Sequence, residues 1–250
     1  MNVDVILTPA ELPRLAKRDL TSTVCVVFDV LRATSAFVTA LHNGAAAIIP
    51  VCEISEALKI NGRQPQALLA GERNGVKIRV KRREFDFGNS PREFVPEKVK
   101  GQTIVSTTTN GTRALRACAA ARTILAGAFL NLSATATFLL RSKRKNVLVV
   151  CAGTGENTAL EDVLAAGAFC DVLAQNRKRL ALSDSARVAL GTFHQSKSGL
   201  AEIIGESENA RRLLAIPELH DDVEFCLRRD FIDLVAGMRR DRFIVISRQS

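Results

Sequence analysis

Three segments of this chain share one order of features: an apolar run, a short polar loop and an amphipathic helical stretch. The apolar runs cover residues 24–28, 103–105 and 147–151, and none shows the strict alternation of a half-exposed strand. Runs of this kind are typical of strands that helices cover on both faces. The pattern therefore predicts an α/β fold with three layers, α/β/α, around a mainly parallel sheet.

The remaining elements are weaker in the sequence. Shorter strands are predicted at residues 46–49, 67–69 and 124–126, and residues 72–91 are expected to be mostly irregular. No linker or tandem repeat interrupts the chain, so we expect a single domain over residues 1–250. The part from about 183 to 250 is expected to be mostly helical with a final strand, at residues 186–195, 201–214, 221–229 and 243–246.

The polar loops after the three long strands are the expected place for a ligand. In open α/β sheets, ligands bind outside the carboxyl ends of the strands. The loops at residues 29–34, 107–113 and 152–158 should therefore converge on one crevice.

The loop at residues 107–113 concentrates groups that bind anions. It contains several threonine hydroxyls, the carboxamide of Asn110, a glycine and Arg113, and it opens a helical stretch. Such groups at a helix start suit a phosphate or a similar oxyanion. An ordinary N-cap is the alternative, because Thr and Asn favour that position. A cap needs one such residue and this loop supplies several, so we favour anion binding.

Acidic residues cluster near the predicted strand ends; they are Asp29, Glu72, Asp86, Glu156, Glu161 and Asp162. Asp29 directly follows a strand, where a buried charge is costly unless it faces the crevice. Carboxylate oxygens, together with substrate phosphate and water, are what Mg²⁺ takes as ligands. Each acid has a structural alternative: residues 158–161 match a capping box, and Glu72 could pair only with Arg73.

Basic and polar residues form a second set: Arg32, Arg73, Asn89, Ser90, Asn110 and Arg113. Residues 90–93 also match a capping box with proline at the first helical position, which does not exclude an anion site. The dense basic run at residues 81–83 is interpreted as a solvated face. His220 lies beside two aspartates, and its role stays open.

Composition limits the classes of function. The net charge of +9 suits either a polyanion or a small acidic substrate, but the chain has no Trp and no Tyr for base stacking. Its six cysteines form no CxxC pair, and no apolar run approaches the ~20 residues of a membrane span. The glycine loop at 153–158 has Thr158 where a dinucleotide fingerprint has Gly or Ala. We expect a cytoplasmic protein without disulfides, zinc or a membrane partner.

Five motifs, in order, carry a family resemblance: residues 29–34, 71–73, 85–91, 107–113, and 151–153 with 161–162. Together they resemble the 2-phosphosulfolactate phosphatase family over about residues 24–167. The resemblance implies a compact α/β fold and Mg²⁺-dependent hydrolysis of 2-phospho-3-sulfolactate to sulfolactate and phosphate, a step toward coenzyme M. Two segments depart from the family pattern: residues 76–84 are longer and more basic, with Glu84 in place of Gly, and residues 219–222 lack a Gly-His pair.

The resemblance and the residues together assign roles. We expect Asp29, Arg32 and Arg113 to be catalytic, and Mg²⁺ to be bound by Asp29, Glu161 and Asp162, with Glu72 as a further candidate. The expected substrate-binding residues are Arg73, Asn89, Ser90, Thr109, Asn110, Gly111 and Thr112. Direct attack by water and a phosphoenzyme on Asp29 both stay open.

The expected partner is a small anionic phosphoester, with no nucleic acid and no membrane, and a homo-oligomer is left open. The alternatives are a polyanion or nucleic-acid binding protein without turnover, and an NAD(P)-binding oxidoreductase.

Overall fold

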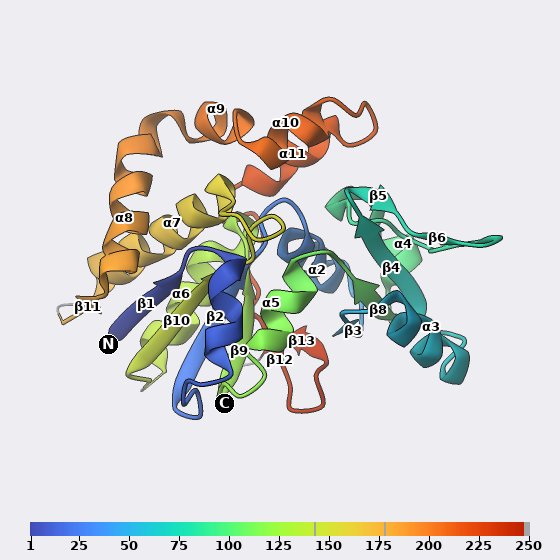
Figure 1. The fold of residues 1–250 in the computed structure, drawn as a ribbon, viewed down its shortest axis with the longest axis horizontal. Coiled ribbons are helices and arrows are strands. Elements are labelled where there is room, and N and C mark those ends of the chain that lie inside the picture. The colour runs from blue at the N-terminus through green and yellow to red at the C-terminus, as the bar shows by residue number, and fades with distance from the viewer. Residues whose placement is uncertain (143, 178, 248–250) are drawn as a thin grey trace.

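The computed structural model describes residues 1–142, 144–177 and 179–247. Within them, one sheet holds eleven strands in the order β11-β1-β10-β2-β9-β12-β13-β3-β8-β4-β5 (Figure 1). Their bounds are β1 Asn2–Ile6, β2 Thr23–Phe28, β3 Ala47–Pro50, β4 Leu68–Arg73, β5 Val76–Lys77, β8 Thr103–Thr107, β9 Thr123–Gly127, β10 Asn146–Cys151, β11 Ala181–Leu182, β12 Ala236–Met238 and β13 Ile244–Ile246. A separate hairpin pairs β6 Arg79–Val80 with β7 Arg83–Glu84.

Helices flank this sheet. They are α1 Leu12–Leu15, α2 Ala33–His42, α3 Ile54–Arg63, α4 Pro96–Val99, α5 Gly111–Ala117, α6 Leu132–Arg141, α7 Leu160–Asn176, α8 Asp184–Ser196, α9 Leu200–Gly205, α10 Glu208–Leu214 and α11 His220–Leu227. Short 3₁₀ turns occur at η1 Pro9–Glu11, η2 Pro91–Glu93, η3 Phe129–Asn131 and η4 Lys197–Gly199. No helix among the described residues has the length and apolarity that a membrane crossing requires.

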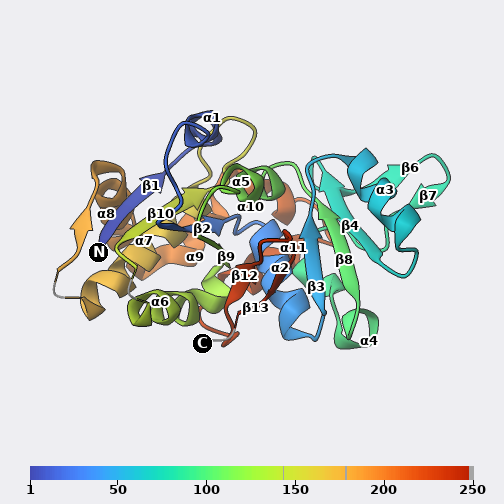
Figure 2. The same cartoon turned by 90° about the horizontal axis from the view of Figure 1, so that it is seen from below.

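The sheet consists of two parallel blocks joined by an antiparallel hairpin. Strands β11, β1, β10, β2 and β9 form one block, and β3, β8 and β4 form the other. Between them, β12 pairs antiparallel with β9 and with β13, and β13 touches β3 through one residue pair. The two blocks run at a wide angle to each other in Figure 2. The predicted mainly parallel α/β sheet is confirmed.

Alternate residues of the central strand β2 pack against helices on opposite faces of the sheet. All six residues of β2 are buried. Cys25 and Val27 belong to the core cluster that contains α2 and α5, whereas Val26 and Phe28 belong to the cluster that contains α6 and α7. Both faces of β2 are therefore covered, which explains why its sequence is apolar without alternation.

Six strands and one helix boundary were missed from the sequence. The missed strands are β1, β5, β6, β7, β11 and β12, and three of them, β5, β6 and β7, lie within residues 72–91, which were expected to be mostly irregular. β1 alternates Val3 and Val5 with polar neighbours, so it does not resemble the other buried strands, although it pairs in parallel with β10 and β11. β12 is three residues long and is held by its neighbours on both sides. The helix predicted at 201–214 divides, because α9 ends at Gly205 and the Ser207 hydroxyl accepts the Ala210 amide to begin α10.

Candidate functional site

A pocket of about 390 Å³ lies at the carboxyl ends of β2, β4, β8 and β10. Residues of all three polar loops line it, so their predicted convergence on one crevice is confirmed. The lining residues are Asp29, Leu31, Arg32, Glu72, Asn74, Gly75, Asn89, Thr109, Asn110, Gly153, Thr154, Gly155, Asn209, Arg212 and Leu213.

Asp29 follows β2 and lies at the centre of the acidic side. Its side chain is buried, and Oδ1 accepts the Ala33 amide at the start of α2 over 3.0 Å. A side chain at position 111 would meet this carboxylate, because an ideal Cβ there falls 2.5 Å from Asp29 Oδ2. Burial raises the pKa of Asp29 to about 7, and the charges of Glu72 and Glu161 act in the same direction.

Glu72 lies at the end of β4 and connects two loops. Its Oε1 accepts the Thr109 amide over 2.8 Å, and its Oε2 accepts the Gly75 amide over 2.7 Å. Glu72 therefore does not depend on Arg73 for a partner. The Arg73 guanidinium instead donates to the carbonyl oxygens of Glu72 and Cys52, and to Thr107 Oγ1.

Glu161 and Asp162 are adjacent in α7 but differ in their partners. Asp162 Oδ1 accepts the Val30 amide over 2.8 Å, and Oδ2 accepts the Gly153 amide over 2.9 Å. Burial, with Glu161 and Asp29 nearby, raises the pKa of Asp162 well above its usual range. Glu161 Oε1 accepts from Asn209 Nδ2 over 2.7 Å, whereas its buried Oε2 has no hydrogen-bond partner among the described residues. The capping-box alternative for Glu161 is wrong, because α7 begins without a side-chain cap.

The threonine loop divides between structural and pocket-facing residues. Thr108 and Thr112 bond to each other: the Thr112 hydroxyl donates to the Thr108 carbonyl oxygen over 2.9 Å, and the Thr112 amide donates to Thr108 Oγ1 over 3.2 Å. Thr109 and Asn110 line the pocket, where Thr109 Oγ1 and Asn110 Oδ1 are buried without partners among the described residues. Capping thus accounts for Thr108 and Thr112 and leaves Thr109 and Asn110 for a ligand.

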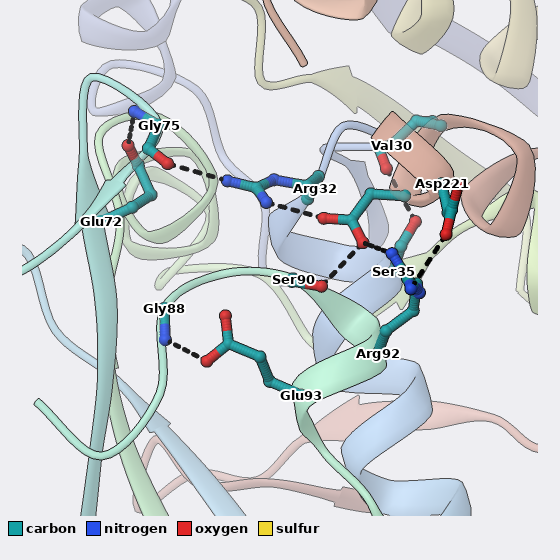
Figure 3. A network of polar contacts seen from close by, with 11 residues as sticks. Val30, Arg32, Ser35, Glu72, Gly75, Gly88, Ser90, Arg92, Glu93 and Asp221 are labelled. Carbon is teal, nitrogen blue, oxygen red and sulfur yellow. Dashed lines mark hydrogen bonds and ion pairs between the residues drawn. The ribbon is translucent and has the colours of Figure 1, made fainter. Parts of the chain in front are cut away.

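The arginine side of the pocket is built around Arg32 (Figure 3). Its guanidinium is 3% exposed; NH1 donates to Asp222 Oδ2 over 2.7 Å, and NH2 donates to the Gly75 carbonyl oxygen over 3.1 Å. Ser90 Oγ donates to Asp222 Oδ1 over 2.7 Å. The capping box predicted at residues 90–93 is wrong: Glu93 instead accepts the Gly88 amide, and the segment is a 3₁₀ turn.

Other predicted site residues lie at the rim or outside the pocket lining. Arg113 forms an exposed ion pair with Glu156 over 3.1 Å, and neither residue lines the pocket. Asp86 accepts the Leu69 amide and is likewise absent from the lining. Ser90 and Gly111 support the wall through Asp222 and Asp29, whereas Asn89 lines the pocket directly.

The fit to a divalent cation rests on uncompensated charge. Asp29, Glu72, Glu161 and Asp162 are all at least 92% buried, and the positive charge of Arg32 is already paired with Asp222. In this conformation, no three His, Cys, Asp or Glu side chains among the described residues stand together as a ligand set. Asp29 and Glu161 nevertheless have oxygens that backbone amides do not fully occupy, so a hard cation suits them.

The lining or supporting residues that were missed from the sequence are Asn74, Gly75, Asn209, Arg212, Leu213 and Asp222. Asn209 and Arg212 are one turn apart in α10, and Asp222 lies in α11. The acidic pair beside His220 was the one sequence feature that drew attention to α11. No local pattern predicts that α10 and α11 reach the pocket. His220 itself is exposed and contacts Asp221 over 3.3 Å.

Comparisons with known proteins identify the family of this chain. A family model described as 2-phosphosulpholactate phosphatase matches residues 7–241, a range that includes α10 and α11. A protein of Caldanaerobacter subterraneus named probable 2-phosphosulfolactate phosphatase is 41% identical over 224 residues, covering 89% of this chain and 90% of its own. Proteins with the same name from Thermotoga petrophila and Clostridium tetani are 41% and 36% identical, covering 97% and 94% of this chain and 98% and 96% of their own.

Proposed function

The chain belongs to the 2-phosphosulpholactate phosphatase family, and from this premise we propose that it hydrolyses 2-phospho-3-sulfolactate with Mg²⁺. A related 2-phospho-hydroxy acid is the nearest alternative substrate. The family to which the chain belongs is one of phosphoric monoester hydrolases. The products are the free hydroxy acid and inorganic phosphate.

The observation that carries the metal requirement is the buried Glu161 Oε2 oxygen without a partner. Burying a carboxylate oxygen without a partner is costly, and the charges of Glu161, Asp29, Glu72 and Asp162 act on one another, while the nearby Arg32 is already paired with Asp222. We assign direct contact with Mg²⁺ to Asp29 and Glu161, with Glu72 and Asp162 adding negative charge. When bound, Mg²⁺ would offset the charge on the phosphoryl oxygens during transfer.

The opposite wall suits the anionic groups of the substrate. Arg32 uses two of its five N–H donors on Asp222 and Gly75, which leaves donors for a phosphoryl oxygen. Thr109 and Asn110 lie beside the acids and would contact the same group. Asn74, Asn89 and Arg212 would bind the carboxylate and the sulfonate.

Asp29 is the group that would react. Its buried carboxylate lines the pocket beside the proposed metal, where it could accept a proton from water. As a carboxylate it could equally attack phosphorus and form a phosphoenzyme. Acid quenching of a single turnover with radiolabelled substrate separates these routes, because only the second leaves label on the protein.

The test is phosphate release from matched esters. We expect turnover of 2-phosphosulfolactate that a chelator abolishes and Mg²⁺ restores, and slower turnover of 2-phospholactate, which lacks the sulfonate. Glu161→Gln should raise the Mg²⁺ concentration needed for half-maximal activity, whereas the rim variant Glu156→Gln should not. Full activity after exhaustive chelation would contradict the metal assignment, and equal turnover of both esters would contradict recognition of the sulfonate.

A further inference from the structure

We propose that Asp222 is a positioning residue for the phosphatase reaction, because it fixes the guanidinium of Arg32 at the pocket wall. The two side chains meet over 2.7 Å, and they are 0% and 3% exposed. Asp222 lies in α11, 190 residues from Arg32 in sequence. This inference rests on the proposed function for the identity of the reaction, but not for the geometry.

The contact with Asp222 fixes the position of the Arg32 guanidinium but leaves some of its N–H donors free to bind a ligand. A guanidinium has five N–H donors in a fixed plane, and Arg32 uses one on Asp222 and one on the Gly75 carbonyl oxygen. Two bonds from opposite partners fix the plane of the group, and the remaining donors belong to a residue that lines the pocket. Arg32 can therefore offer a pre-oriented surface to an oxyanion.

The second oxygen of Asp222 anchors it from another loop. Oδ1 accepts the Ser90 hydroxyl over 2.7 Å, and Arg92 approaches the same oxygen at 3.7 Å. Both oxygens of this buried carboxylate thus have partners, unlike those of Glu161. The side chains of Arg32, Ser90 and Arg92, which all contact Asp222, lie close together in Figure 3.

The ion pair between Arg32 and Asp222 is connected to the acidic side of the pocket through a series of hydrogen bonds. Arg32 donates to the carbonyl oxygen of Gly75, whose amide donates to Glu72 Oε2 over 2.7 Å. Glu72 Oε1 then accepts the amide of Thr109. Displacing Arg32 would therefore loosen the turn that holds Glu72, and a displacement of this kind can lower a rate about 10²-fold without touching the reacting atoms.

The decisive variant is Asp222→Asn, with Asp221→Asn as its matched control. Asp221 is the preceding residue of α11, is 65% exposed and pairs with Arg92 over 3.0 Å. In Asp222→Asn we expect kcat to fall about 10²-fold and the inhibition constant of inorganic phosphate to rise at least about 10-fold. In Asp221→Asn, both values should stay within about 2-fold of wild type, as for other exposed pairs.

A double variant distinguishes positioning from general damage. Once Arg32→Ala has removed the guanidinium, adding Asp222→Asn should weaken phosphate binding no further. Equal losses from Asp222→Asn with and without Arg32 would mean that Asp222 supports the fold alone, and would overturn the proposal. So would a folded Asp222→Asn with unchanged kcat and phosphate affinity.

Ser90→Ala keeps the test informative if Asp222→Asn fails to fold. It removes one contact to Asp222 Oδ1 and leaves the ion pair, so we expect kcat to fall about 3- to 10-fold, the scale of one lost hydrogen bond. An unchanged kcat in a folded Ser90→Ala would count against the proposal that Asp222 positions Arg32. Phosphate affinity needs no turnover, so it tests Asp222 even if the wild-type protein leaves 2-phosphosulfolactate intact and the proposed function fails.

Discussion

The two sides of the pocket are stabilised in different ways. On the acidic side, Glu72 and Asp162 each bind two backbone amides, which come from loops that follow neighbouring strands. On the arginine side, Arg32 is held by the side chain of Asp222, which comes from a helix near the other end of the chain. The acids are thus fixed by the sheet, whereas the arginine depends on the docking of α11.

This difference indicates which groups in the pocket remain available to bind a ligand. The acidic side keeps one buried oxygen, Glu161 Oε2, without a hydrogen-bond partner among the described residues, and the charge of Arg32 is already paired with Asp222. The arginine side is balanced in charge and keeps spare N–H donors. An acidic wall with an unpartnered carboxylate oxygen and an arginine wall with spare N–H donors together suit a metal ion and an oxyanion.

The largest expected effect is on the acidic side, at Asp29. Asp29→Asn removes the carboxylate, and we expect kcat to fall at least about 10²-fold, on the scale of a lost electrostatic catalytic group. The midpoint of thermal unfolding should not fall, because burial disfavours the charge that the substitution removes.

Asp86→Asn is the control for Asp29, since Asp86 also accepts a backbone amide but lies outside the pocket lining. Steady-state kinetics and thermal unfolding of both variants check the comparison. Equal rates for Asp29→Asn and wild type would return Asp29 to a structural role.

The next effect separates two adjacent residues of the acidic side. Asp162→Asn places an amide group where one backbone N–H needs an acceptor, so we expect the free energy of unfolding to fall by about 1–3 kcal/mol. Glu161→Gln should lower the free energy of unfolding little or not at all, because Oε2 has no hydrogen-bond partner among the described residues that the substitution would remove. Chemical denaturation without metal measures both. The reverse order would mean that Glu161, rather than Asp162, joins the loops.

A smaller effect concerns pH and the metal. The pKa of Asp29 is raised from 3.8 to about 7, so the folded chain binds this proton more tightly than the unfolded chain does. This group's contribution to the free energy of unfolding is therefore fully present below about pH 4 and is lost as the pH rises to about 7. Mg²⁺ would favour the carboxylate, so it should raise the melting temperature by a few degrees more at about pH 8 than at about pH 5.

Monovalent salt at matched ionic strength is the control for the metal effect, and Glu161→Gln should reduce the rise at both pH values. A rise that is the same at both pH values and in both proteins would show that the cation binds elsewhere. That outcome would remove the distinction between the two walls, because the acidic side would then need no ion.

The sequence predicted what neighbouring residues determine. Apolar runs gave the long strands, and polar loops after them gave Asp29, Glu72 and the pocket-facing part of the threonine loop. Asp222, Asn209 and Arg212 could not be found in this way, because their helices reach the pocket only through tertiary packing. Neither capping-box alternative, at residues 90–93 or at 158–161, is formed, since Ser90 and Glu161 bond to distant helices instead of their own.

The smallest expected effect is at the rim, where sequence and structure give different expectations. The sequence predicts a catalytic Arg113, whereas the structure places its side chain 45% exposed against Glu156. Arg113→Lys should therefore change kcat by no more than about 3-fold, as for an exposed ion pair. Neutralising Lys81, Arg82 and Arg83 in the projecting β6–β7 hairpin (Figure 1) should likewise leave kcat nearly unchanged. Any change in kcat/KM should shrink as salt screens the charges over about 8–10 Å. A large loss of kcat in Arg113→Lys alone would show that the rim closes onto the substrate and that the basic wall extends beyond Arg32.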